Sequence, residues 1–220
     1  MSDLTPKAER TRQLILNTAL DLFRSKGYEA TTMRDIAAEA NVSLGLAYRY
    51  FERKEALVLA LYQQMAADTD EAIARMPRGT TADRFVATMQ ERLDQAAPHR
   101  ETFAALFGAI MSPSSGAELF GEEADSMRRR AEAAFISLVR ESSDAPAAGH
   151  IENVGRLLYS THFLVLLFWV RDRSADQRST QALLQFIHDL LPWLLRGLFL
   201  PPVGRELGRF IRIVDGVLGL

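Results

Sequence analysis

The sequence lacks cysteine, a long apolar run and a strong net charge. With no cysteine among 220 residues, disulfide bonds, thiolate zinc sites and thiol catalysis are excluded, which is typical of proteins from a reducing cytoplasm. The most apolar stretch, residues 163–170, is much shorter than the roughly 20 residues needed to cross a bilayer. No signal-peptide pattern is present. We therefore expect a cytoplasmic protein that does not bind or span a membrane.

The motifs of common enzyme classes are also missing. The sequence contains no HExxH zinc motif, no GxSxG nucleophile turn and no glycine-rich phosphate loop. Its four histidines are scattered, and His150 and Glu152 are two residues apart rather than one helical turn, which makes a poor metal pair. We expect no enzymatic activity, no metal site and no cofactor.

Charge gives only a local indication of a partner. The formal net charge is −2, and residues 1–60 contain nine basic and eight acidic side chains, so net charge does not indicate nucleic-acid binding. Lys7, Arg10 and Arg12, however, cluster before the first apolar helical pattern. They predict a basic arm that either contacts phosphates or the minor groove, or is disordered.

Residues 30–41 predict a short helix with defined ends. Thr32 and Asp35 have capping-box spacing, in which a hydroxyl and a carboxylate bind backbone N–H groups that a helix leaves unpaired. The helix should therefore begin at Met33. It should end before Asn41, a residue that tolerates the left-handed conformation common just past a helix end.

A second short helix should follow almost at once. Ser43 can cap a helix that runs roughly over residues 44–51. A connection this short forces the two helices to cross steeply, which is helix-turn-helix geometry. In such a unit the second helix lies in a DNA major groove, with its N-terminal residues at base edges and later residues near phosphates. Leu44 and Leu46 can read bases only by apolar contact, for example with thymine methyl groups.

A helix before this pair completes a three-helix unit and a family resemblance. Ile15, Ala19 and Phe23 share one helical face, and Gly27 predicts its end. Residues 15–57, which read IL..AL.LF...G and then TT..DIA..A.VS.G..Y.YF..K..L, resemble the N-terminal domain of the TetR family of transcriptional regulators. Asn41 stands where that family usually has glycine.

The resemblance implies a set of DNA-contacting residues. Arg34 is the expected base reader, and Tyr48, Arg49 and Lys54 suit phosphate contact because their donors are positively charged or phenolic. The full implied set is Thr32, Arg34, Ser43, Leu44, Gly45, Leu46, Tyr48, Arg49, Tyr50 and Lys54.

Everything beyond residue 57 has a helical pattern, so the expected fold is all-α. We assign residues 1–53 to the helix-turn-helix domain and residues 54–220 to a larger C-terminal helical domain, with 54–76 as the connecting helix closed by Pro77. Further helices are expected at about 81–97, 100–112, 121–142, 150–171 and 176–200, followed by an amphipathic tail helix over 203–217.

The last long helix has a wide apolar face that predicts a homodimer interface. Together with the helix at 150–171 it should form a four-helix interface with a symmetry mate, and burial inside one subunit is the alternative. The tail helix should pack back on the C-terminal domain, in its own subunit or across the dimer, with membrane-surface binding as an alternative. The residues of the apolar face are Leu183, Leu184, Ile187, Leu190, Leu191, Leu194, Leu195 and Leu198.

Members of the TetR family usually hold a small-molecule effector in the C-terminal domain. The side chains here that could line such a site are mostly apolar and so imply a largely apolar effector. His162 could bind a ligand carbonyl or hydroxyl, or instead a backbone carbonyl. The candidate lining is Met89, Phe103, Phe107, Met111, Tyr159, His162, Phe163 and Trp169.

The resemblance implies a repressor that binds a palindromic double-stranded DNA operator as a homodimer. Its two recognition helices would enter successive major grooves about 34–36 Å apart, and effector binding would release the protein. Two alternatives remain: a transcriptional activator of the same fold, and a helical protein-interaction adaptor without salt-sensitive DNA affinity.

Overall fold

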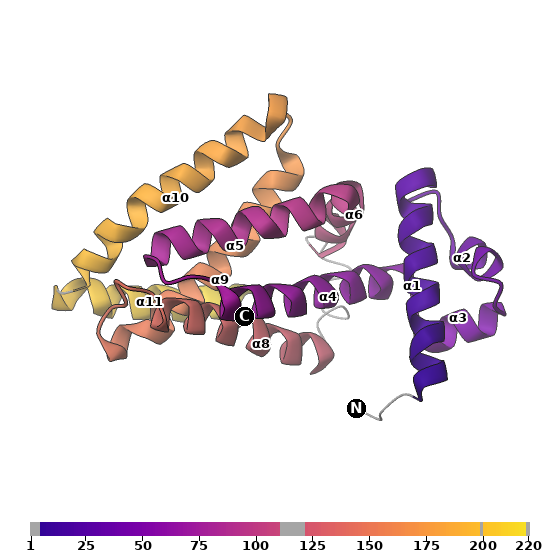
Figure 1. Ribbon diagram of the computed structural model, residues 1–220, viewed down its shortest axis with the longest axis horizontal. Coiled ribbons are helices and arrows are strands. Elements are labelled where there is room, and N and C mark those ends of the chain that lie inside the picture. Colours follow the sequence, from indigo (N-terminus) through magenta and orange to yellow (C-terminus); the bar gives the residue numbers. More distant parts are fainter. Residues whose placement is uncertain (1–4, 111–121, 199, 219–220) are drawn as a thin grey trace. The chain divides into compact units, whose positions relative to one another are not determined.

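The computed structural model describes residues 5–110, 122–198 and 200–218. Throughout these ranges the chain is all-helical, without a strand (Figure 1). It divides into two compact units, one formed by Met1–Met65 with Gln95–Leu119 and the other by Ala66–Asp94 with Phe120–Leu220. Helices α4 (Lys54–Arg75) and α5 (Thr81–Ala96) contribute residues to both units. The functional boundary expected between residues 53 and 54 stays a prediction.

The first helix begins earlier than its apolar pattern indicates. Helix α1 spans Pro6–Lys26 because the Thr5 hydroxyl accepts the Ala8 N–H at 3.3 Å and proline suits a first turn that needs no donor. Lys7, Arg10 and Arg12 are therefore helical, and the prediction of a basic arm before the first helix was wrong. The helix ends at Gly27, whose φ of 89° disfavours any residue with a β-carbon.

The next two helices match the expected helix-turn-helix. Helix α2 (Met33–Glu39) has the Thr32–Asp35 capping box in full, and Asn41 adopts a φ of 53° just after it. Helix α3 (Leu44–Tyr50) is capped by the Ser43 hydroxyl, which accepts the Leu46 N–H at 3.1 Å. Both helices lie beside α1 (Figure 1), around a core whose buried members include Ile15, Leu16, Ala19, Phe23, Ile36 and Ala47.

The later helices also follow the sequence expectations closely. After α5 the chain makes a short 3₁₀ turn, Ala97–His99, and continues into α6 (Arg100–Ile110). The second unit then adds α8 (Glu122–Arg140), α9 (Ala148–Arg171), α10 (Arg178–Gly197) and α11 (Pro201–Leu218). The expected tail helix is thus present, and it packs against α9 of its own chain.

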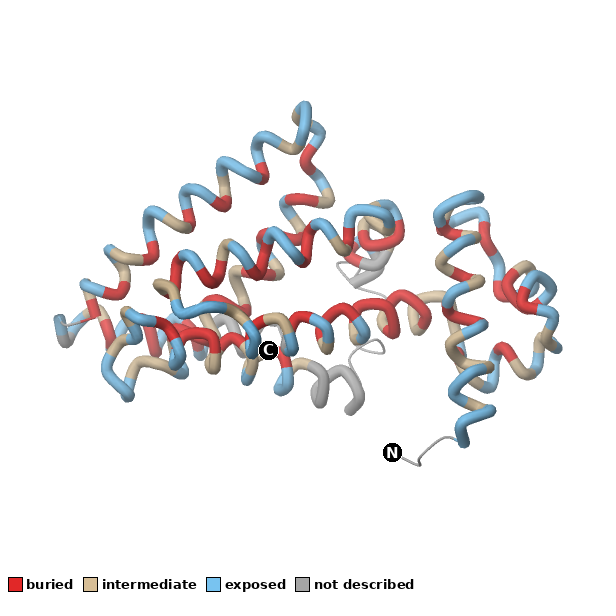
Figure 2. The backbone as a smooth tube through the Cα atoms, in the orientation of Figure 1, coloured by how far each residue is buried: buried red, intermediate tan, exposed pale blue. Residues whose placement is uncertain are grey.

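Helix α9 is the core helix of the second unit. It packs against α8, α10 and α11 and buries Leu158, Val165 and Trp169 among other residues (Figure 2). Within the part of the chain that the structure describes, α9 is also the one helix long and apolar enough to cross a membrane, with a mean hydropathy of 1.2. Because 44% of that window is buried in the protein, we interpret its apolar composition as core packing.

Candidate nucleic-acid interface

Helix α3 presents one face to solvent and one to the core of the first unit. Ala47 is fully buried, whereas Gly45 and Arg49 are exposed and Tyr48 is 47% exposed. Leu44, Leu46 and Tyr50 are half-buried. This division follows from the helical period, since seven residues make two turns and only one side can pack inward. The residues expected to meet DNA therefore lie on or beside the open face.

The start of α2 adds two exposed residues with different tasks. Arg34 is exposed, as a base-reading side chain must be. The Thr32 hydroxyl, by contrast, donates to Asp35 Oδ2 at 2.9 Å and accepts the Asp35 N–H at 3.2 Å. Thr32 thus acts first as a helix cap, and its role in DNA contact stays a prediction.

Asp35 ties this cap to the end of α1. The Lys26 ammonium donates to Asp35 Oδ2 at 2.8 Å. That bond, together with those from the Thr32 backbone and side chain, lowers the pKa of Asp35 to about 2. The carboxylate is therefore charged throughout the physiological range and holds α1 and α2 together.

Lys54 is less exposed than its expected role suggests. Its ammonium donates to the Tyr28 carbonyl oxygen at 2.9 Å and lies 4.4 Å from the centroid of the Tyr28 ring. The Tyr28 hydroxyl in turn donates to Glu55 Oε1 at 3.1 Å. Sequence reasoning missed Tyr28 and Glu55 altogether. No local spacing indicated them, because Tyr28 and Lys54 are 26 residues apart in the chain.

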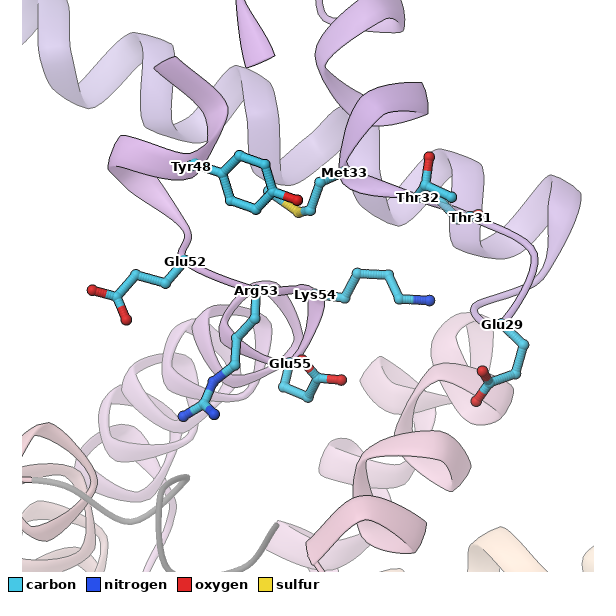
Figure 3. Close-up of a pocket in the computed structure, with 9 residues that line it drawn as sticks. All are labelled: Glu29, Thr31, Thr32, Met33, Tyr48, Glu52, Arg53, Lys54 and Glu55. Atoms are coloured by element: carbon cyan, nitrogen blue, oxygen red, sulfur yellow. The ribbon is translucent and has the colours of Figure 1, made fainter. Parts of the chain in front are cut away.

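An open depression of about 320 Å³ lies between the start of α2, the end of α3 and the start of α4 (Figure 3). Tyr48 reaches it from α3, and Lys54 reaches it from the opposite side (Figure 3). The lining combines two cations with three acids, so the positions of individual charges decide how an anion is received. The lining residues are Glu29, Thr31, Thr32, Met33, Tyr48, Glu52, Arg53, Lys54 and Glu55.

The expected effector-binding residues are divided between the two units. Met89, Tyr159, His162 and Trp169 are buried in the second unit, where Phe163 is half-buried. Phe103 and Phe107 are buried in the first unit, and Met111 lies outside the described residues. Burial accounts for these side chains as core residues, and their role in ligand binding stays a prediction.

His162 lies in an aromatic cluster with Phe135, Tyr159 and Phe163. Ring centroids are 4.3 Å apart for His162 and Phe163, and 5.3 Å for His162 and Phe135. His162 Nδ1 lies 2.6 Å from the Tyr159 carbonyl oxygen, which is the backbone contact that the sequence left as an alternative. Burial and the Arg92 charge lower the pKa of His162 well below its usual value. The ring is therefore neutral, with Nδ1–H as donor and Nε2 as the acceptor nitrogen. Phe135 was not among the expected residues.

Apolar side chains are exposed along α9 and α10. On α10, Phe186, Leu190 and Trp193 are 60%, 49% and 70% exposed, and their spacing places them on one face. On α9, Leu164 and Phe168 are also exposed. Of the eight expected interface residues, only Leu190 is exposed. Two are half-buried, Leu183 and Leu194, and five are buried within the unit, Leu184, Ile187, Leu191, Leu195 and Leu198.

Comparisons with known proteins find similarity to transcriptional regulators. The family model "Bacterial regulatory proteins, tetR family" matches residues 15–61. The transcriptional repressor KstR of Mycolicibacterium smegmatis is 28% identical over 98% of this chain and 92% of its own length. Two other curated regulators match over shorter stretches, 22% and 42% of this chain, and the chain spans only 17% and 46% of their length.

Two solved structures share the fold over most of the chain. A TetR-family regulator from Streptomyces coelicolor is 23% identical, covers 96% of this chain and 97% of its own, and has a TM-score of 0.59. The repressor FadR of Thermus thermophilus, in complex with lauroyl-CoA, is 24% identical, covers 79% of this chain and 93% of its own, and has a TM-score of 0.57.

Proposed function

Because this chain belongs to the TetR family of transcriptional regulators, we propose that it represses transcription in the cytoplasm. In this proposal it binds a palindromic operator as a homodimer and leaves the operator when an effector binds. The family is non-enzymatic, so the function lies in binding. The observation that carries the proposal is the exposed face of α3, on which Tyr48 and Arg49 are open to solvent.

The docking follows from the chemistry of that face. Arg49 supplies a guanidinium and Tyr48 a hydroxyl, and both can donate to phosphate oxygens on either side of a major groove. Leu44 and Leu46 begin α3, where helix-turn-helix proteins meet base edges, and their side chains favour thymine methyl groups. Arg34 at the start of α2 can donate two bonds to a guanine.

Dimer formation is supported by the exposed stripe Phe186, Leu190 and Trp193 on α10, with Leu164 and Phe168 on α9. Large apolar side chains exposed together on one helix face, as on α10, mark an interaction site. In a two-fold dimer the same patch on each copy meets its equivalent, and the operator repeats that symmetry.

We propose a small, largely apolar effector held in the C-terminal helices near His162. The aromatic cluster of His162, Phe135 and Phe163 provides apolar contact for such a ligand. Lauroyl-CoA, bound by the T. thermophilus protein of the same fold, carries an apolar lauroyl chain on a charged CoA group, so free laurate and lauroyl-CoA are the first pair to test for release of the operator complex. Release requires the effector to prefer the non-binding conformation, and couplings of about 1–3 kcal/mol are typical.

Selection of duplexes from a random library, followed by mobility-shift titration, tests the proposal. We expect a palindromic site. Tyr48→Phe should weaken binding by about tenfold through loss of one charge-assisted bond. Lys54→Ala should lower the slope of log affinity against log salt by about one. Arg24→Ala, which alters an exposed cation paired with Asp21 on α1, serves as the control.

The same titration separates the alternatives. Binding without selection of any sequence, or equal affinity for the wild type, Tyr48→Phe and Lys54→Ala, would overturn the docking. Absence of salt-sensitive DNA affinity would favour a protein-interaction adaptor. A reporter gene whose expression falls when the regulator is deleted would favour an activator.

A further inference from the structure

We propose that Tyr28 and Glu55 are positioning residues for operator binding: the hydrogen bond between them fixes the Glu55 carboxylate on Tyr28, so that the Lys54 ammonium remains available to a DNA phosphate. We call Tyr28, Lys54 and Glu55 the Tyr28 latch. The inference rests on the proposed DNA-binding function and assigns roles to two residues that need not contact DNA themselves.

The latch joins two segments that are distant in sequence. Tyr28 lies in the connection between α1 and α2, while Lys54 and Glu55 form the first turn of α4. The backbone oxygen and ring face of Tyr28 hold the ammonium, at 2.9 Å and 4.4 Å, and its hydroxyl holds the carboxylate at 3.1 Å. Tyr28 alone thus positions both the Lys54 ammonium and the Glu55 carboxylate at the start of α4.

Tyr28 is itself immobilised by the core of the first unit. It is buried, and its ring packs edge-on against Phe23 with centroids 4.9 Å apart. The Thr31 hydroxyl, also buried, donates to the Gly27 carbonyl at 2.8 Å and fixes the turn on the other side. Because Tyr28 and Thr31 are both anchored, the latch can hold the Lys54 side chain in one orientation before DNA binds. Little side-chain entropy of Lys54 is then lost when it contacts a phosphate.

The charges around the depression explain why the position of the Glu55 carboxylate matters for phosphate binding. Glu29, Glu52 and Glu55 all line it together with Lys54 and Arg53 (Figure 3). A freed Glu55 carboxylate can pair with a cation that a phosphate needs, and it repels the phosphate directly. Burial and the negative charge of Glu55 raise the pKa of Tyr28, so its hydroxyl stays protonated and donates at any physiological pH.

A double-mutant cycle measured on the selected operator duplex tests this role. Tyr28→Phe keeps the ring and the backbone carbonyl but removes the donor to Glu55. We expect operator affinity at low salt to fall about fivefold, in proportion to the loss of one hydrogen bond. Tyr28→Phe combined with Glu55→Gln should return affinity to within about twofold of the wild type, because no charge is then released.

Glu52→Gln provides the matched control, since Glu52 is an exposed acid of the same depression. If general charge reduction explained the rescue, Tyr28→Phe with Glu52→Gln would rescue equally well. We expect that pair to remain weakened. Circular dichroism melting checks folding, and should Tyr28→Phe not fold, Glu55→Asp shortens the side chain, breaks the same bond and is expected to weaken binding likewise.

The outcomes distinguish the latch from the function on which it rests. Wild-type affinity in Tyr28→Phe, or a loss that Glu55→Gln does not reverse, overturns the latch while Tyr48→Phe still reports DNA binding. If the wild-type protein selects no duplex, the proposed function fails and the latch fails with it.

Discussion

At the scale of single residues, Asp35 carries several bonds at once. Its carboxylate accepts from the Thr32 backbone N–H at 2.9 Å, from the Thr32 hydroxyl and from the Lys26 ammonium. Each bond favours the charged form, which is why the pKa of Asp35 falls to about 2. A carboxylate with a lowered folded-state pKa stabilises the protein above its unfolded pKa, and that stabilisation is lost as the pH falls toward the folded value.

Asp35→Asn should therefore destabilise the protein in a pH-dependent way. The difference in urea midpoint between wild type and variant should be constant above about pH 5 and shrink between about pH 4 and pH 2, since the unfolded carboxyl titrates near 3.9. Glu39→Gln, which removes a carboxylate from the same helix without touching Thr32 or Lys26, is the control. An equal difference at pH 7 and pH 3 would show that the Asp35 charge is not what stabilises the cap.

Helix-capping hydrogen bonds of this kind were predictable from the sequence because the donor and the acceptor are close together in the chain. Thr32 and Asp35 are three residues apart, and Ser43 caps a backbone N–H only three residues ahead. Thr5 and Pro6 are an equally local signal for the start of α1, but Lys7 and its basic neighbours are also typical of an extended arm. The contact between Tyr28 and Lys54 had no such signal, since only the packing of α4 against the α1–α2 turn creates it.

At the scale of helices, α8 and α9 approach unusually closely at Gly155. A β-carbon built there would lie 2.5 Å from Ile136 Cγ1 and 2.7 Å from Ile136 Cα. Backbone atoms cannot move aside as the end of a flexible side chain can. The absence of a side chain at this position therefore sets the spacing of the two helices and, through α9, the core of the second unit.

Gly155→Ala should force α8 and α9 apart despite the better helix propensity of alanine. We expect a loss of about 1–3 kcal/mol in the free energy of unfolding, measured by urea titration, as for other overpacked sites. Gly149→Ala near the start of α9 is the matched control, because a β-carbon there meets nothing within 4 Å, and it should be neutral or stabilising by up to about 1 kcal/mol. Similar effects of the two changes would refute the close packing.

Apart from the start of α1, helix positions were predictable to within a few residues because apolar periodicity, proline and glycine mark them. Which side of α10 faces inward was not, since leucines occupy much of its circumference. The structure buries Leu184, Ile187 and Leu191 and leaves Phe186 and Trp193 exposed. Periodicity identifies an apolar face, but only the neighbouring helices decide which part of that face is buried within the subunit.

At the scale of the whole molecule, the proposed operator binding requires a dimer. A single recognition helix of seven residues offers few contacts, whereas two copies on one palindrome add their contacts and gain from effective concentration. The stripe of Phe186, Leu190 and Trp193 offers the aromatic anchors that dominate stable interfaces. Operator affinity and dimer stability should therefore be coupled.

Trp193→Asp tests this coupling by placing a charge at one end of that stripe. Burying an unpaired carboxylate in each half of a symmetric interface opposes association, so sedimentation equilibrium should show the dimer dissociation constant raised at least about tenfold. Operator affinity should fall with it, although the helix-turn-helix is untouched. Phe210→Asp, at a 50% exposed aromatic residue on α11, is the control and should leave both quantities unchanged. If Phe210→Asp dissociates the dimer and Trp193→Asp does not, the interface lies on α11 and the assignment to α9 and α10 is wrong.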